Sequence, residues 1–141
     1  MSPRVAIVGA LLMAGVMLLG CQSQAAFETR PIADIERALR GGALEVCTKT
    51  DNAKGLANQA VFTRVLNVAV DCHEEIVPLI VDRFTGAGDR DAAARNFESM
   101  SRPRGDGVVW TWANFTIAAF GPRDDRVIER VTKAMDRLGA K

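Results

Sequence analysis

Residues 61–84 read VFTRVLNVAVDCHEEIVPLIVDRF and form the longest apolar pattern in the chain. Apolar side chains recur in it at helical spacing, so we expect a helix that ends or kinks before Pro78, which removes a backbone donor and clashes with the preceding turn. A second helix then follows. The first apolar stripe consists of Val61, Val65, Val68 and Cys72, widened by Phe62, Leu66 and Ala69, and the second of Ile76, Ile80 and Phe84.

Three further segments carry the same helical period. Ile32, Ile35 and Leu39 lie between Pro31 and Gly41, which are typical of the two ends of a helix. Glycines 86 and 88 end the preceding segment, and Asp89 or Asp91 is expected to cap a short helix. The apolar residues of that short helix are Ala93, Phe97 and Met100, and those of a last helix, opened by Pro122 and Asp124 and ended by Gly139, are Val127, Ile128, Val131, Met135 and Leu138.

Two segments are ambiguous between helix and strand. Residues 43–50 alternate like a strand but also fit a helical turn. Residues 108–120 have the aromatic and β-branched composition of a strand, yet their apolar residues share one helical face, and a lone strand would lack partners. We therefore expect a mostly α protein, a small single-domain bundle of about five helices with one disulfide. The alternative is an α+β fold with a short strand pair formed by 43–50 and 108–120.

The N-terminus has the pattern of an export signal. A short cationic start, Met1 to Arg4, precedes an apolar run over residues 5–19, and Gly20 and Cys21 follow directly. The run is shorter than the about 20 residues that span a bilayer. Residues 18–21, Leu-Leu-Gly-Cys, resemble the lipobox of bacterial lipoproteins; a non-lipid secretory signal is the alternative.

The resemblance divides the chain into three parts. We expect residues 1–20 to be a cleaved lipoprotein signal peptide and residues 21–29 to comprise the lipidated Cys21 (palmitate and related acyl chains) and a flexible tether. Residues 30–141 are expected to form a globular domain. Gln22 after the cysteine resembles the sorting pattern of outer-membrane lipoproteins. We expect attachment to the bilayer through acylated Cys21, with the domain facing the periplasm.

With Cys21 lipidated, two cysteines remain in a compartment that permits disulfides. Pairing Cys47 with Cys72 closes a loop worth about 3–4 kcal/mol on the chain-entropy model. The alternative is a metal or redox site, because Asp71, Cys72, His73, Glu74 and Glu75 place potential ligands together. Their spacing matches neither a CxxC pair nor paired zinc ligands, so we expect no metal, no cofactor, and His73 at a helix surface.

Charge and motifs disfavour two function classes. Removing Arg4 with the signal leaves 17 of 18 basic residues against 17 acidic ones, without a basic run, so nucleic acid is not expected as a partner. His73 is the only histidine, and no GxSxG, GxGxxG or GxxxxGK pattern occurs. Glycosidase chemistry would need two placed carboxylates, for which Glu74, Glu75 and Glu98 are candidates, but solvated acids explain them equally. We expect no enzyme.

The tryptophans leave a choice between partner binding and core packing. Trp110 and Trp112 share a face on a strand but not on a helix. Aromatic anchors are enriched at interface hot spots, which makes Trp110 a candidate partner contact. Alternatively, both tryptophans belong to the core.

These expectations together describe a small lipid-anchored binding protein. In tethering, size, expected helicity and a single disulfide, the chain resembles the pilotin lipoproteins that carry secretins to the outer membrane. We therefore expect a non-enzymatic adaptor or assembly factor for an envelope protein machine, with a protein partner of unknown identity. The alternative is a lipid-anchored protective protein that confers toxin immunity or conjugative exclusion.

Overall fold

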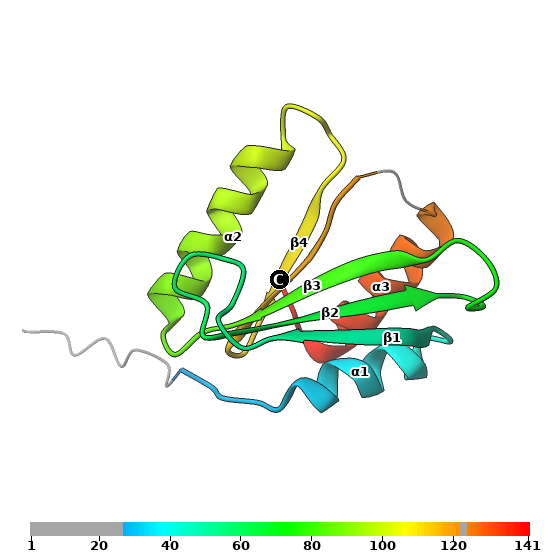
Figure 1. Cartoon of the computed structure of the whole chain (residues 1–141), viewed down its shortest axis with the longest axis horizontal. Coiled ribbons are helices and arrows are strands. Elements are labelled where there is room, and N and C mark those ends of the chain that lie inside the picture. The colour runs from blue at the N-terminus through cyan, green and yellow to red at the C-terminus, as the bar shows by residue number, and fades with distance from the viewer. Residues whose placement is uncertain (1–26, 122–123) are drawn as a thin grey trace, which may run out of the picture.

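The computed structural model describes residues 27–121 and 124–141. The predicted signal peptide 1–20, Cys21 and most of the tether lie outside the described residues. Over the described part, the fold is α+β, with three helices and a five-stranded antiparallel sheet (Figure 1). The prediction of a mostly α bundle of about five helices is therefore wrong.

The strands of the sheet follow the order β1-β2-β3-β5-β4, and every neighbouring pair is antiparallel. The helices occupy the start, the middle and the end of the domain. In chain order the elements are α1 (Ile32–Gly41), β1 (Glu45–Asn52), β2 (Phe62–Ala69), β3 (Val77–Arg83), α2 (Ala87–Ser101), β4 (Val108–Trp112), β5 (Phe115–Ala119) and α3 (Asp125–Leu138).

One face of the sheet, here called the core face, is covered by α1 and α3. Alternate residues of the strands point to the same face, and on this face they meet the apolar stripes of the two helices. Burial of these side chains is the main favourable term that holds the domain together. The cluster includes Leu66, Val68, Val77, Leu79, Val81, Trp110, Phe115 and Ile117 from the sheet and Ile35, Leu39, Val127, Val131, Ala134 and Met135 from the helices.

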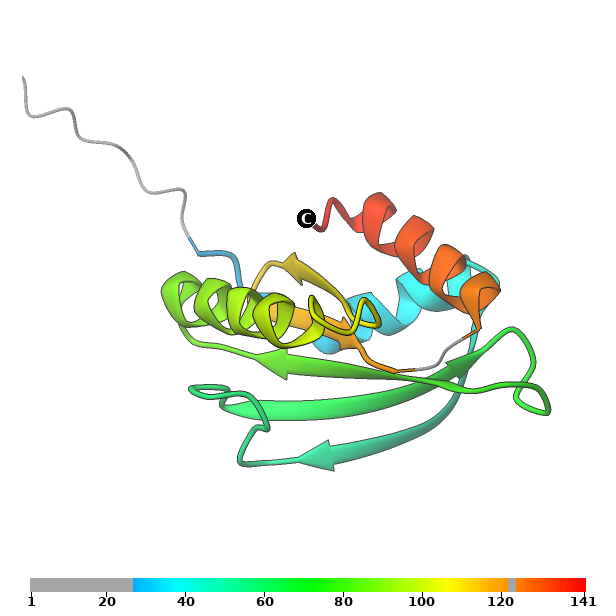
Figure 2. The ribbon, with the colours of Figure 1, turned by 90° about the horizontal axis from the view of Figure 1, so that it is seen from above.

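The opposite face, here called the groove face, is covered only in part. Helix α2 packs against β4 and β5, and its Phe97 ring lies 4.1 Å from the Phe120 ring, centroid to centroid. In the view of Figure 2, α2 lies beside β4 and β5, whereas no helix lies in front of β1, β2 and β3. Within the described residues, the groove face therefore has no second helix beside α2.

The segment 61–84 is a pair of strands and not a pair of helices. Leu66 and Val68 point to the core face, and Val65 on the other face is half-buried, so apolar residues stand on both sides of β2. Pro78 lies within β3, opposite Asn67 of β2. Strand β5 pairs only with residues 80–83 of β3, so the missing N–H of Pro78 costs no hydrogen bond to β5.

The two ambiguous segments are also strands, but they do not pair with each other. Residues 43–50 overlap β1 at one edge of the sheet, while residues 108–120 form the β4–β5 hairpin at the other edge. The helix expected over 108–120 and the alternative strand pair are therefore both corrected. The hairpin turns through Ala113, which has a positive φ of 49°.

The other three helices agree with the sequence pattern. Helix α1 begins after Pro31, and α3 has Asp124 as its N-cap, whose side chain accepts the Arg126 backbone N–H at 2.8 Å. Gly139 ends α3 in the left-handed conformation. Helix α2 begins earlier than expected: its N-cap is Gly86, so neither Asp89 nor Asp91 is the cap.

Both ends of the described chain meet at the β4–β5 hairpin. The Arg30 backbone N–H donates to Asn114 Oδ1 at 2.8 Å, and the Arg90 guanidinium lies 5.7 Å from the centroid of the Phe27 ring. Residues 27–30, expected to belong largely to a flexible tether, thus contact the folded domain. At the other end, Lys141 exchanges two backbone hydrogen bonds with Thr111 of β4.

Candidate functional site

A groove of about 740 Å³ lies on the groove face between α2, the strands β3 to β5 and the loop 53–60. This volume is within the range of about 300–1,000 Å³ that is typical of ligand pockets. Its lining is mostly apolar, and two of its large apolar side chains are well exposed: Leu56 on the loop (57%) and Met100 on α2 (52%). These two residues stand on opposite walls.

The floor of the groove consists of two neighbouring rows of residues across the sheet. One row is apolar and contains Ile80, Ala118 and Val109, which are paired in register on β3, β5 and β4. The next row is polar and contains Asp82 and Thr116, which are also paired in register. Rows two residues apart along a strand are separated by about 6.5–7 Å. The floor therefore offers an apolar surface and a carboxyl group side by side.

Asp82 is the more buried of the two carboxyl residues that line the groove, with 6% of its surface exposed. The hydroxyl of Thr63, directly opposite on β2, donates a hydrogen bond to Asp82 Oδ1. The same Thr63 oxygen accepts the backbone N–H of Leu56 at 2.7 Å. Through Thr63, the carboxyl on the floor is connected to the loop that forms one wall.

Gly55 shapes that wall. Its φ is +72°, and a Cβ atom built there would lie 2.3 Å from the Ala60 carbonyl oxygen. Only glycine fits such a close approach at a left-handed position. The glycine thus allows the loop 53–60 to fold back on itself and present Leu56 to the groove.

The charge of the groove has one sign. Asp82 and Asp89 line it, and no lysine, arginine or histidine does so among the residues that the structure describes. Asp82 also takes part in no ion pair within the described chain. A ligand with an apolar body and a cationic group therefore complements this surface best.

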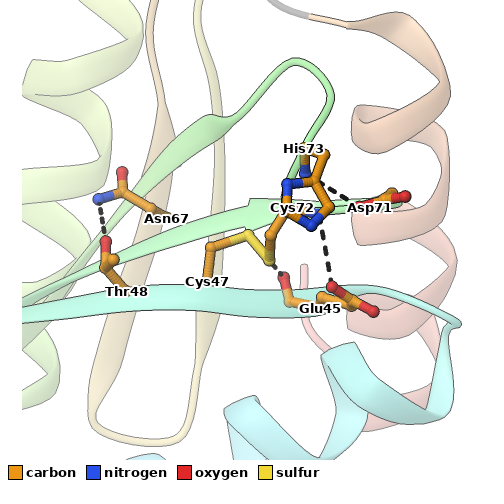
Figure 3. Close-up of a disulfide and its surroundings, with 7 residues drawn as sticks. All are labelled: Glu45, Cys47, Thr48, Asn67, Asp71, Cys72 and His73. Carbon is orange, nitrogen blue, oxygen red and sulfur yellow. Dashed lines mark hydrogen bonds between the residues drawn. A yellow bond between two sulfur atoms is a disulfide. The ribbon is translucent and has the colours of Figure 1, made fainter.

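The predicted disulfide between Cys47 and Cys72 is present (Figure 3). Cys47 is the extra residue of a β-bulge in β1, because Val46 and Thr48 pair with consecutive residues of β2. Cys72 lies in the turn after β2 and not on a buried helix face. The bridge joins the edge strand β1 to the end of its neighbour, which makes it a structural staple at a distance from the lining residues of the groove.

The acidic cluster around His73 does not form a metal centre. Cys72 is used in the disulfide, and the His73 backbone N–H donates to Asp71 Oδ1 at 2.9 Å in an exposed turn (Figure 3). In the described ranges, no group of three or more His, Cys, Asp or Glu side chains is placed to hold a metal ion. His73 lies in a turn and not on a helix surface.

The other candidate residues are dispersed. Glu74 and Glu75 are exposed in the β2–β3 connection, where Glu74 pairs with Arg126 at 3.4 Å, and Glu98 is exposed on α2. Trp110 is 6% exposed and belongs to the core cluster. The structure thus places Trp110 in the core, which was the alternative, and offers no exposed side chain there for the expected partner contact.

A second buried carboxylate, Glu36, lies on the core side. Lys49 Nζ and Arg64 Nη1 lie 2.5 Å and 3.0 Å from its oxygens, and Glu36 is 5% exposed. Burial raises the pKa of Glu36, but the hydrogen bonds and charges of Lys49 and Arg64 outweigh it, so the pKa is lower than its usual value. These contacts fasten α1 to β1 and β2, which is a structural role.

The sequence pattern does not bring together Asp82 and Met100, which line the groove, or Thr63, which donates a hydrogen bond to Asp82. The available signal was Asp82, an acid within the apolar run 76–84, but it has meaning only when that run is recognised as a strand.

No family model, curated protein or solved structure matches the chain. No helix in the described part is long and apolar enough to cross a bilayer.

Proposed function

We propose that this protein is a lipid-anchored, non-enzymatic adaptor of the bacterial envelope, whose groove binds an apolar segment of a protein partner. One observation carries this proposal: a groove of about 740 Å³ is bordered by the exposed side chains Leu56 and Met100. Large apolar side chains gathered at a concave surface are typical of binding sites.

The lining of the groove favours binding over catalysis. Among the described residues that line it, there is no serine, cysteine, histidine or lysine. A Ser–His or Cys–His pair of nucleophile and base within hydrogen-bond reach therefore cannot form from this lining. What the groove offers is an apolar surface with a small number of polar groups, which is the usual composition of a recognition site.

The anchoring part of the proposal rests on the N-terminal sequence pattern. Acylation of Cys21 would hold the domain at the outer membrane on its periplasmic side, and two or three acyl chains make such attachment stable. The disulfide supports an oxidising compartment. The likeness to pilotins is now limited to tethering, size and the disulfide, because the domain is α+β.

Site-specific photo-crosslinking in cells tests the proposed binding site. A photo-reactive amino acid is placed at Met100 in the groove or, as a control, at Lys133, which is exposed on α3 behind the core face. We expect Met100 to capture one envelope protein and Lys133 not to capture it. Equal capture from both positions would contradict the proposal, and capture of a toxin or a conjugation component at Met100 would favour the protective alternative.

The anchor is tested separately by mass spectrometry and fractionation. We expect acylated Cys21 as the first residue of the mature protein, and release of a Cys21→Ser variant from the outer-membrane fraction. An unmodified Cys21 in protein that remains soluble would overturn the anchored part of the proposal and leave the groove unaffected.

A further inference from the structure

We infer that the groove receives an amphipathic helix of the partner, oriented so that a lysine or arginine on its apolar face pairs with Asp82. This inference rests on the proposed function, because it specifies the chemistry of the segment that the groove binds. Three features carry it: the incomplete helical layer on the groove face, the surface of α2, and the position of Asp82.

The two faces of the sheet differ in their helical cover. On the core face, α1 and α3 pack side by side over the strands. On the groove face, within the described residues, α2 alone packs on β4 and β5. Beside α2, the lining of the groove comes from strands β3 to β5 and from the loop 53–60, so a partner helix would lie between α2 and this loop.

The surface that α2 turns toward this position suits a helix neighbour. Ala92, Ala93, Asn96 and Met100 line the groove at spacings of three and four residues, which places them on one side of α2. The two alanines leave room for the close approach of about 8–10 Å between axes at which helices pack. Ala92, Asn96 and Met100 are exposed, so this side has no cover from the described chain.

Asp82 adds to this apolar surface a preference for a positive charge on the partner helix. Asp82 is 6% exposed, and the Thr63 hydroxyl that donates to its carboxyl carries no positive charge. The apolar row with Ile80 lies about 6.5–7 Å away along the strands, close to the about 5.4 Å of one helical turn. A partner helix can therefore place an apolar residue on Ile80 and a basic residue, one turn away, near Asp82.

A lysine is suited to this position because its stem can lie along the apolar floor while its ammonium group reaches the carboxyl. The resulting ion pair would be hydrogen-bonded and shielded from water. Such charge-assisted bonds are stronger than neutral ones. The groove would thus prefer basic amphipathic helices over neutral or acidic helices of the same shape.

The test uses the full mature chain with Cys21→Ser, which removes the lipid, and three synthetic helical peptides. The peptides are identical except at one position of the apolar face, which is Lys, Met or Glu. Fluorescence anisotropy is expected to show the Lys peptide binding about tenfold or more tightly than the Met peptide, and the Glu peptide binding weakest.

Two variants with the same charge change separate a specific pair from general electrostatics. Asp82→Asn retains an oxygen that can accept the Thr63 hydrogen bond, and Asp136→Asn removes an exposed acid from α3. We expect Asp82→Asn to abolish the preference for Lys over Met and Asp136→Asn to preserve it. If all peptides bind wild type equally, or if Asp136→Asn has the same effect, the inference is overturned while binding in the groove stands.

A carbodiimide crosslink gives a readout that does not depend on a variant. The reagent activates a carboxyl, and the peptide lysine amine attacks it to form an amide with release of the urea by-product. Mass spectrometry is expected to locate this amide at Asp82. Attachment only at other acids, or no binding of any peptide to wild type, would contradict the helix-and-cation inference; the Met100 crosslink then decides independently whether the groove binds a partner.

Discussion

Thr63 and Asp82 face each other on β2 and β3, and the Thr63 hydroxyl donates to the Asp82 carboxyl while accepting the backbone N–H of Leu56. One side chain therefore links the floor of the groove to the loop 53–60. The position of Leu56, one of the two exposed apolar residues at the groove, depends on this link. The arrangement gives the site a defined shape before any partner is bound.

Thr63→Val should show how much this link contributes. Valine has the shape of threonine but leaves Asp82 without the hydroxyl donor and the Leu56 N–H without its acceptor. We expect the free energy of unfolding to decrease by about 1–3 kcal/mol, measured by urea denaturation. Thr50→Val, at an exposed position of β1, should change it by no more than about 0.5 kcal/mol. Equal values for both variants would show that the link contributes nothing.

Gly55→Ala tests the wall of the groove. The added Cβ would collide with the Ala60 carbonyl oxygen at a residue whose φ is positive, so we expect a loss of more than about 1 kcal/mol and weaker peptide binding. Gly88→Ala is the matched control, because it lies in the first turn of α2 with nothing within 4 Å of its Cβ position. It should stabilise the fold by about 0.4–1 kcal/mol. A neutral Gly55→Ala would contradict the described loop.

The disulfide should matter for stability and not for recognition. The variant with Cys47→Ser and Cys72→Ser loses a bridge across 25 residues, which corresponds to about 3–4 kcal/mol of unfolding free energy. Reductant should destabilise wild type by a similar amount and leave the double variant unchanged, as urea denaturation would measure. If reductant also destabilises the double variant, the loss of unfolding free energy cannot be assigned to the disulfide.

Glu36 should make stability depend on pH. Its pKa in the folded protein is lowered. Its contribution to the free energy of unfolding is therefore complete above the pKa of the unfolded chain, about 4.3, and is lost as pH falls through the pKa of the folded protein. At pH 7, Glu36→Gln should cost about 1.5–3 kcal/mol, and this difference from wild type should shrink with acidification. Glu98→Gln, exposed on α2, should show no such pH-dependent difference. A constant cost at every pH would disprove the sign of the shift.

The helices at the two ends of the domain could be predicted from the sequence because each buries one stripe against one face. Val127, Val131 and Met135 repeat at helical spacing between Asp124 and Gly139, and the structure places α3 there. In such helices, the capping residues and the apolar stripe indicate the same element with the same ends. The disulfide was predictable as well, since only two cysteines remain once Cys21 is assigned to the lipid.

The sequence pattern of the central strands predicts helices because these strands carry apolar side chains on both faces. In β2, Val65 is half-buried on the groove face and Leu66 is buried on the core face, so the alternation of a half-buried strand is lost. A short continuous apolar run cannot be told from a helix by periodicity alone. If β2 and β3 are taken as helices, residues 108–120 have no strand to pair with. The turn at Ala113 also lacks the Asn-Gly or Asp-Gly signal of a hairpin.

The site itself could not be predicted for the same reason. Asp82 and Thr116 become neighbours only through the pairing of β3 with β5. Met100 joins them only because α2 returns over that part of the sheet. These contacts connect residues far apart in the sequence, so a local sequence pattern cannot predict them.

The central claim is that the groove between α2 and the sheet is where the partner binds. The most direct measurement is the yield of the Met100 photo-crosslink in cells when the groove is filled by Ala93→Trp, compared with Ala33→Trp at an exposed position of α1. We predict that Ala93→Trp abolishes the crosslink and that Ala33→Trp leaves it unchanged. A full crosslink yield from a folded Ala93→Trp protein would contradict the claim.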